Sequence, residues 1–171
     1  MDESRRERFE EVVPALVEPL RRFLARRTDP ATAEDVLAET LLVCWRRVAD
    51  LPDEPLPWAY GVARNCQRNA ERAARRQERV AARFAAQPQD PAPTDDPALH
   101  EALAALPPDD AELLRLWAWE QLTPGEIATV LDITSNAASI RLHRARERLR
   151  DQLRKIEATS GHEGSREGRR P

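Results

Sequence analysis

The sequence predicts an all-α protein made of two small helical domains joined by a flexible, acidic, proline-rich linker. Apolar residues recur three to four positions apart in several segments, which is the spacing of one face of a helix. Only five glycines occur in 171 residues and β-branched runs are few, so no sheet is expected. The segment QPQDPAPTDDP (87–97) has four prolines, three aspartates and no apolar cluster, which is typical of a linker. We therefore expect a first domain at 1–85, a linker at 86–98, a second domain at 99–156 and a disordered tail at 157–171.

The first helix of the first domain is predicted from apolar residues that follow the helical period between Phe9 and Leu24. Pro14 and Pro19 fall inside this segment. Because proline lacks the backbone N–H and clashes with the preceding turn, this helix should be kinked or split.

A second helix should begin after Asp29, which is a good N-cap, with Pro30 at the first helical position. It should run to about Val48 and bury one apolar face. The residues expected on the buried face are Ala33, Val36, Leu37, Leu41, Cys44 and Trp45. The outer face offers Glu34, Asp35, Ala38, Glu39 and Leu42. First-turn carboxylates also favour the helix dipole, so these acids alone do not establish a binding surface.

A proline-rich loop at 49–57 precedes a third helix, which should start near Trp58. The inward residues should be Val62, Ala63, Cys66 and Ala70. The outward residues should be Arg64, Asn65, Arg68, Arg72, Arg75 and Arg76. Trp58 and Tyr60 stand beside these arginines. Aromatic rings can stack on the bases of a single strand while cations hold its backbone, but the same pattern also fits a core aromatic and a solvated basic face.

Positive charge is concentrated in two segments, although the formal net charge of the chain is −3. Seven arginines lie between Arg64 and Arg83 against two glutamates, and seven basic residues lie between Arg141 and Lys155 against two acids. Local potential governs phosphate binding more than net charge does. The two basic segments are therefore candidate nucleic-acid contacts.

The second domain should begin with a helix that carries Leu99, Leu103 and Leu106 and ends at the two prolines that follow. Asp109 or Asp110 should start the next helix. That helix carries Trp117 and Trp119, which we assign to the core and rim of the small domain rather than to a ligand site.

The segment from Leu122 to Leu153 predicts two helices joined by a tight turn. Thr123 and Glu126 form a capping box, and Asp132 stands where a left-handed residue is often needed. Thr134 or Ser135 should cap the second helix. Its inward residues should be Ala138, Leu142, Ala145 and Leu149, and its opposite face shows Asn136, Ser139, His143, Arg144 and Arg148. Short polar side chains at a helix start suit base edges in a major groove and later arginines suit phosphates, so this pair indicates a DNA-binding helix-turn-helix.

Other functional classes find little support in the sequence. Cys44 and Cys66 form no CxxC and lie in apolar stripes, so they are expected to be buried, and the three histidines are scattered. No metal site or cofactor is therefore expected. There is no ExxH pair, no nucleophile with a base and no phosphate-binding glycine loop, so we do not expect an enzyme. The N-terminus lacks a signal-peptide apolar run and no stretch reaches the roughly 18 apolar residues of a membrane helix, which predicts a cytoplasmic protein.

Taken together, these segments resemble a bacterial RNA polymerase sigma factor of the sigma-70 family, extracytoplasmic-function type, over about Phe9 to Lys155. AEDVLAETLLVCWRRV (33–48) is similar to the core-binding helix of the family's region 2, with Glu34, Asp35, Glu39, Thr40 and Trp45 in register. WAYGVARNCQRNAERAARR (58–76) is similar to its promoter-melting and minus-10 reading helix. The residues at 106–150 are similar to region 4. The three motifs follow one another in the family's order and spacing.

The resemblance implies a transcription initiation factor that binds core RNA polymerase through its β′ and β subunits and directs it to promoters. It also implies that no chemistry is performed by this chain, that no membrane insertion occurs and that an anti-sigma partner can hold the protein inactive. The implied polymerase-binding residues are Glu34, Asp35, Ala38, Glu39 and Leu42. The implied minus-10 residues are Asp53, Trp58, Arg64, Asn65, Arg68 and Arg72, with the loop Asp50–Leu56 holding an extruded base. The implied minus-35 residues are Ser135, Asn136, Ser139, Ile140, Arg141, His143 and Arg144.

The sequence departs from the family pattern at several positions. Asn69 stands where aspartate is usual, Asp132 replaces a turn glycine, and Ser139 and Ile140 stand where lysine and serine are common. Ile140 either packs on a thymine methyl group or is buried. Gly61, inside a helix, should cost about 1 kcal/mol relative to alanine.

Two other functions remain open on the sequence alone. One is a helix-turn-helix regulator without a sigma role, which would not need the helix at 58–76 and would bind duplex DNA specifically without polymerase. The other is a paralogue that titrates the partners of a sigma factor.

Overall fold

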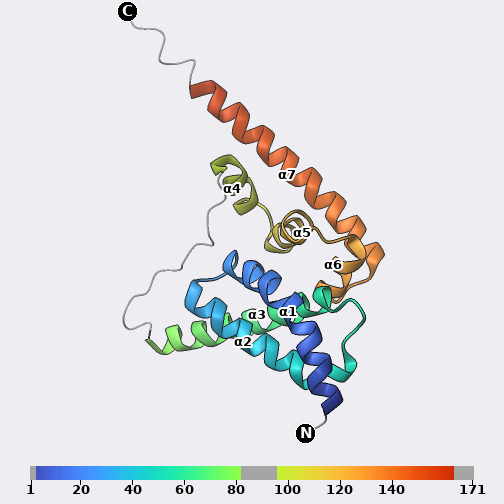
Figure 1. Cartoon of the computed structure of the whole chain (residues 1–171). Helices are drawn as coiled ribbons and strands as arrows, with labels where there is room; N and C mark the ends of the chain where they lie inside the picture. Colours follow the sequence, from blue (N-terminus) through green and yellow to red (C-terminus); the bar gives the residue numbers. More distant parts are fainter. Residues whose placement is uncertain (1–2, 82–95, 164–171) are drawn as a thin grey trace, which may run out of the picture. The chain divides into compact units, whose positions relative to one another are not determined.

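The computed structural model describes residues 3–81 and 96–163 of the chain, and within these ranges every regular element is a helix. The prediction of an all-α fold is therefore confirmed. The helices belong to two compact units (Figure 1). The first unit contains α1 (Glu3–Ala25), α2 (Pro30–Arg46), the short 3-10 helix η1 (Val48–Asp50) and α3 (Pro55–Ala81). The second contains α4 (Pro97–Ala104), α5 (Pro108–Ala118), the start of α6 (Pro124–Leu131) and α7 (Ser135–Glu163). Residues 86–95 of the predicted linker lie outside the described ranges.

Helix α1 continues through both of its prolines, so the predicted split of this segment is wrong. Pro14 is exposed, as are Glu10 and Ala15, whose carbonyl groups lose their helical N–H partners to Pro14 and Pro19. Carbonyl groups on an exposed face are satisfied by water, so the two lost hydrogen bonds do not end the helix. The opposite face holds the helix in place through four buried side chains, Leu16, Leu20, Phe23 and Leu24.

Helix α2 begins as the sequence predicts. The Asp29 carboxylate accepts hydrogen bonds from the backbone N–H groups of Ala31 and Thr32, both at 3.1 Å. Hydrogen bonding to Thr32 lowers the pKa of the Asp29 carboxyl. Ala33, Val36, Leu37 and Cys44 are buried, whereas Leu41 and Trp45 are half-buried. The helix ends at Arg46 rather than at Val48, which opens η1.

Helix α3 begins at Pro55, three residues before the predicted start at Trp58. The first backbone N–H groups of a helix have no intrahelical partner, so Pro55 and Pro57 fit in its first turn without losing a hydrogen bond. The prolines therefore predict a loop at positions 55–57 that in fact form the first turn of α3. The exposed part of the loop shrinks to Pro52, Asp53 and Glu54.

In the second unit, proline residues again open the helices. Asp96 caps α4 by accepting hydrogen bonds from the N–H groups of Ala98 and Leu99, and Pro97 lies at the first helical position. The linker therefore ends before residue 99, where we had placed the start of the second domain. Helix α5 begins at Pro108, so Asp109 and Asp110 lie inside its first turn and do not cap it.

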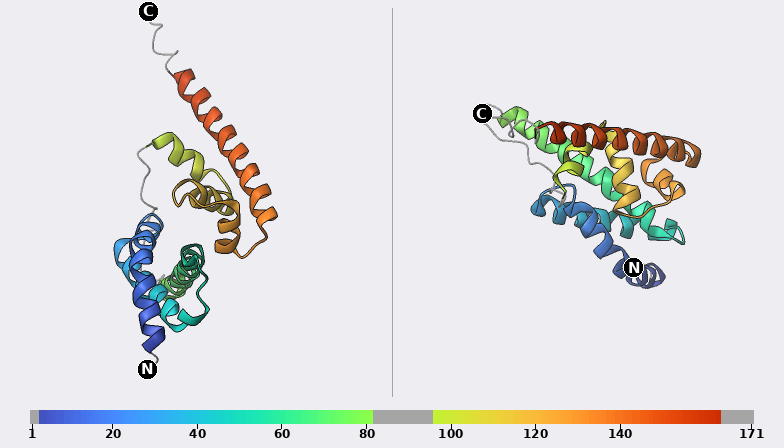
Figure 2. Two further views of the ribbon diagram at one scale, coloured as in Figure 1. Left: turned by 45° about the vertical axis from the view of Figure 1, so that its right-hand side comes forward. Right: turned by 90° about the horizontal axis from the view of Figure 1, so that it is seen from above.

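Helix α7 is longer than the sequence predicts. It continues to Glu163, whereas we had expected a disordered tail from residue 157. The Thr159 hydroxyl donates to the Lys155 carbonyl at 2.9 Å within this extension. The last turns extend past α4 in both Figure 1 and Figure 2. Glycine at position 161 and the scarcity of apolar residues had suggested an earlier end, but a helix that starts on a packed domain can propagate at little further cost.

Candidate nucleic-acid and polymerase interfaces

Only three residues, Asp132 to Thr134, connect α6 to α7, which is the short connection expected of a helix-turn-helix. The backbone N–H of Thr123 donates to the Glu126 carboxylate at 2.7 Å, and the N–H of Glu126 donates to the Thr123 hydroxyl at 3.3 Å. This reciprocal pair is the predicted capping box. Asp132 has φ = 54°, and the N–H of Ile133 donates to the Ala128 carbonyl at 3.0 Å. Together they form a Schellman-type helix end with Asp132 in the left-handed position, as expected.

The start of α7 is capped by Thr134, whose hydroxyl accepts from the N–H of Ala137 at 3.1 Å. This resolves the choice between Thr134 and Ser135. Ser135 is left at the first helical position with its side chain exposed. The start of a helix directs partly unpaired N–H groups and a positive dipole end outward, which favours contact with phosphate.

The predicted minus-35 residues share one property, which is that all are exposed. They are Ser135, Asn136, Ser139, Ile140, Arg141, His143 and Arg144. Three predicted inward residues, Ala138, Leu142 and Ala145, are buried, and Leu149 is half-buried. Ile140 is 44% exposed, so the alternative that it is buried is wrong. The Ser139 hydroxyl donates to the Ser135 carbonyl at 3.0 Å, which leaves its oxygen lone pairs as acceptors.

Arg148 does not belong to the DNA-facing set in which the sequence placed it. Its guanidinium forms an ion pair with the Asp110 carboxylate of α5. The Asp110 side chain is 12% exposed and that of Arg148 is 53% exposed. The pair joins α5 to the middle of α7. Asp110 is one of three buried polar residues among those the structure describes, and the sequence pattern indicated it only as a helix start.

Trp117 is 39% exposed, and the guanidinium carbon of Arg146 lies 4.6 Å from its ring centroid. This distance is typical of a cation–π contact. Trp119 is half-buried and lies near Arg115. The prediction that one of the two tryptophans lies in the core of the second unit is therefore wrong: Trp117 is on the surface and Trp119 is at the rim.

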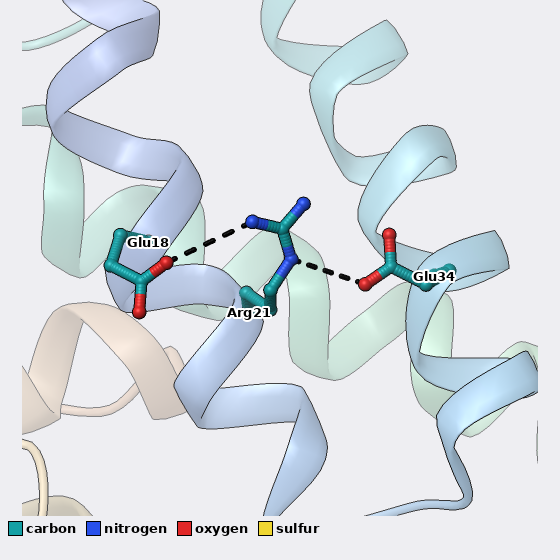
Figure 3. A network of polar contacts seen from close by, with 3 residues as sticks. All are labelled: Glu18, Arg21 and Glu34. Carbon is teal, nitrogen blue, oxygen red and sulfur yellow. Dashed lines mark hydrogen bonds and ion pairs between the residues drawn. The ribbon is translucent and has the colours of Figure 1, made fainter.

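The predicted polymerase-binding residues lie together on the exposed face of α2. Glu34, Asp35, Ala38, Glu39 and Leu42 are all exposed, and Leu42 reaches 45%. One of the acids has a partner within the chain: the Glu34 carboxylate lies 3.1 Å from Nε of Arg21 (Figure 3). Nη1 of the same guanidinium lies 3.8 Å from the Glu18 carboxylate. Part of the negative charge of Glu34 is therefore already compensated. Asp35 and Glu39 carry the acidic character of this face.

The predicted minus-10 residues divide by burial. Asp53, Asn65, Arg68 and Arg72 are exposed, whereas Trp58 and Arg64 are half-buried. The guanidinium carbon of Arg47 lies 5.6 Å from the ring centroid of Trp58. This cation comes from the segment after α2, whereas the sequence predicts the arginines of α3 as the neighbours of Trp58.

Tyr60 cannot stack on a base in this structure. It is 4% exposed and its ring lies 4.9 Å from that of Phe23 in the core of the first unit. Of the two aromatic residues proposed at the start of α3, only Trp58 therefore remains accessible. Periodicity placed both near the arginines but did not indicate the aromatic partner on α1.

Both cysteines are free and buried, as predicted, and their burial has a chemical consequence. Burial raises the pKa of the Cys44 thiol to about 11, and burial also raises the pKa of Cys66. Because the thiolate is the nucleophile, we expect alkylation of Cys44 in the folded protein at pH 8 to be roughly a hundredfold slower than in denaturant, and alkylation of Cys66 to be slowed as well. The rate in the folded state should rise about tenfold per pH unit up to the Cys44 pKa. Mass spectrometry after iodoacetamide treatment measures both rates, and equal rates in the two states would contradict the burial.

Within the described residues, no group of three or more His, Cys, Asp and Glu side chains is arranged to hold a metal ion. No helix in the same part of the chain is both long enough and apolar enough to cross a membrane.

Comparison with known proteins identifies the family. The protein-family model described as "Sigma-70, region 4" matches residues 97–149, which contain α4 to α6 and the first half of α7. The sigma factor CarQ of Myxococcus xanthus is 33% identical over 160 residues, which is 87% of this chain and 91% of CarQ. The probable sigma factor RfaY of Xanthomonas campestris is 32% identical over 144 residues, which is 76% of this chain but only 36% of RfaY.

The fold is also found in a solved sigma factor. The chain matches RpoE of Bartonella quintana, crystallised with the anti-sigma factor NepR, with a TM-score of 0.60 and 20% identity over 85% of this chain and 96% of that one. The likeness in fold adds to the sequence identity that extends over nearly all of CarQ. The chain belongs to the sigma-70 family of RNA polymerase sigma factors, extracytoplasmic-function type.

Proposed function

We propose that this chain is a transcription initiation factor that binds core RNA polymerase in the cytoplasm and directs it to promoters. The observation that carries the proposal is the 33% identity to a sigma factor along 91% of that protein's length. Catalysis belongs to the polymerase, and the role of this chain is recognition and promoter melting.

Recognition of the minus-35 element is assigned to the start of α7. Its first two turns present Asn136, Ser139 and Ile140 for base edges, and Arg141 and Arg144 lie further along for phosphates. A lone set of two or three arginine–phosphate contacts gives weak binding that falls steeply with salt. We therefore infer that α7 alone does not select a promoter at physiological salt.

The minus-10 contact is assigned to the first unit. Asp53 in the exposed loop would meet an extruded base, Trp58 would stack at the edge of the melted region, and Asn65, Arg68 and Arg72 would hold the strand. Bases that leave the duplex gain stacking and pocket contacts that paired bases cannot make. This contact therefore favours the melted state over the duplex.

Polymerase docking makes the two weak DNA contacts act together. The face formed by Asp35, Glu39 and Leu42 offers negative charge around an exposed apolar side chain, which suits a basic helical partner with an apolar centre. Once both units are bound to one enzyme, the second DNA contact becomes intramolecular and its effective concentration rises. An anti-sigma factor, such as the one bound to the Bartonella relative, would oppose this by covering the same faces.

In vitro transcription with purified core polymerase on a promoter library tests the proposal. We expect defined start sites only when both chain and core enzyme are present, with shared sequence elements upstream of them. A variant with Arg141→Ala and Arg144→Ala should lose minus-35 preference, whereas the control Arg150→Ala with Arg154→Ala, in the later turns of α7, should keep it. If the chain alone bound specific duplex sites and core enzyme added nothing, the chain would be a helix-turn-helix regulator without a sigma role.

A further inference from the structure

The first turns of α1 hold the segment that leads from α2 into the exposed loop. Nη2 of Arg8 donates to the carbonyl oxygen of Leu51 at 3.0 Å, 43 residues away in sequence. Nη2 of Arg5 donates to the carbonyl oxygen of Arg46 at 3.2 Å, at the last residue of α2. The ring of Phe9 lies 5.1 Å from that of Trp45 in an edge-on contact. Three successive contacts therefore fix the start of α1 against one short region of the chain.

Leu51 is the last anchored residue before the loop tip. It is 6% exposed, and Val48 in the preceding 3-10 helix is fully buried. Pro52, Asp53 and Glu54 are exposed, and α3 then starts at Pro55. With so few residues between two fixed ends, the position of the tip depends directly on where its ends are held. A carbonyl bonded by a charged guanidinium is held more strongly than one bonded by water.

The role of Arg8 differs from that of its neighbour Arg6. Nε of Arg6 lies 2.8 Å from the Glu10 carboxylate on the same helix, and its side chain is 54% exposed. A pair four residues apart on an exposed helix contributes only a few tenths of a kcal/mol, and this one joins two residues of the same helix. The bond from Arg8 crosses to another element and is part-buried.

We propose that Arg8 is a positioning residue for minus-10 recognition: by holding the Leu51 carbonyl, it fixes the tip Pro52–Glu54 at the place where Asp53 meets the extruded base. The proposal rests on the proposed function, because the tip reads a base only if the chain is a sigma factor. Arg5 supports the same region from the end of α2. Neither arginine touches DNA in this role.

The test measures base selectivity in the full chain with core polymerase. Transcription is compared on four promoters that differ only at the base extruded into the loop, and on four that differ at one minus-35 base. Arg8→Gln should reduce selectivity at the extruded base about tenfold, because a charge-assisted bond to the loop is lost. Selectivity at the minus-35 base and affinity for core enzyme should not change. Arg8→Lys, which keeps a cationic donor, should restore most of the selectivity, and the control Arg6→Gln should match the natural chain.

The other outcomes are decisive as well. Unchanged selectivity at the extruded base in a folded Arg8→Gln variant would overturn the proposal, as would equal losses at both promoter elements. If circular dichroism shows that Arg8→Gln does not fold, Arg5→Gln takes its place in the test. We then expect a smaller loss of selectivity, confined to the extruded base. Unchanged selectivity in Arg5→Gln would contradict the proposal. If the natural chain itself supports no promoter-specific transcription, the proposed function is wrong, and the positioning role of Arg8 is wrong with it. A failure of the positioning role alone would leave promoter-specific transcription by the natural chain intact.

Discussion

Replacing Asp35 and Glu39 together by lysine should abolish binding of the chain to core RNA polymerase. Both side chains are exposed on the same face of α2, beside the exposed Leu42. Reversing two charges turns an attraction for a basic partner into a repulsion, and like charges brought together across an interface cost several kcal/mol, which is a loss of roughly a hundredfold or more in affinity. Fluorescence anisotropy of the labelled chain titrated with core enzyme measures the effect.

A matched control separates this effect from a general change in charge. Glu7→Lys with Glu11→Lys makes the same change in net charge at two exposed positions of α1 and should bind core enzyme within about threefold of the natural chain at physiological salt. Glu34→Gln should have a smaller effect than Asp35→Asn, because Arg21 already compensates part of its charge. Normal binding by the folded Asp35→Lys, Glu39→Lys variant would place the polymerase surface elsewhere.

The features that the sequence predicted well depend on residues close together in the chain. The Asp29 cap, the Thr123–Glu126 capping box and the left-handed Asp132 each involve partners no more than five residues apart. Such contacts depend only on the chemistry of a few neighbouring side chains. The exposed faces of α2 and α7 were predicted for a related reason, since helical periodicity alone decides which side chains share a face.

The features that the sequence did not predict depend on partners far away in the chain or on proline in a tolerated place. Tyr60 is buried because its ring packs on that of Phe23 on α1. Arg148 pairs with Asp110, a residue of α5 that lies 38 positions earlier in the sequence, and so it is not available as a DNA contact. Periodicity marks a residue as outward but cannot name a buried acid on another helix. The prolines of α1 and α3 predict an interruption of the helix, although the first turn of a helix and a hydrated helix face both accept proline.

The contact between Asp110 and Arg148 has a consequence for the stability of the second unit. Removing the guanidinium by Arg148→Met leaves the nearly buried Asp110 carboxylate without its cation, and a charge left unpaired in such a place is strongly destabilising. We expect the free energy of unfolding to fall by about 2 kcal/mol, less than for a fully buried pair because Arg148 is half exposed and water can partly replace it. Urea denaturation of the full chain, followed by circular dichroism, measures the change.

The two partners should not be equivalent, and this asymmetry separates the ion pair from simple loss of side-chain packing. Asp110→Asn leaves a half-exposed arginine that water can solvate, so it should cost about 1 kcal/mol, roughly half the effect of Arg148→Met. With both replaced, the loss should be smaller than the sum of the single losses, because the second replacement removes a group that has already lost its partner. Arg150→Met, at an exposed position two residues later on α7, should change stability by less than about 0.5 kcal/mol. Additive losses, or a larger loss for Asp110→Asn than for Arg148→Met, would mean that the carboxylate does not depend on Arg148 and that packing alone holds α7 against α5.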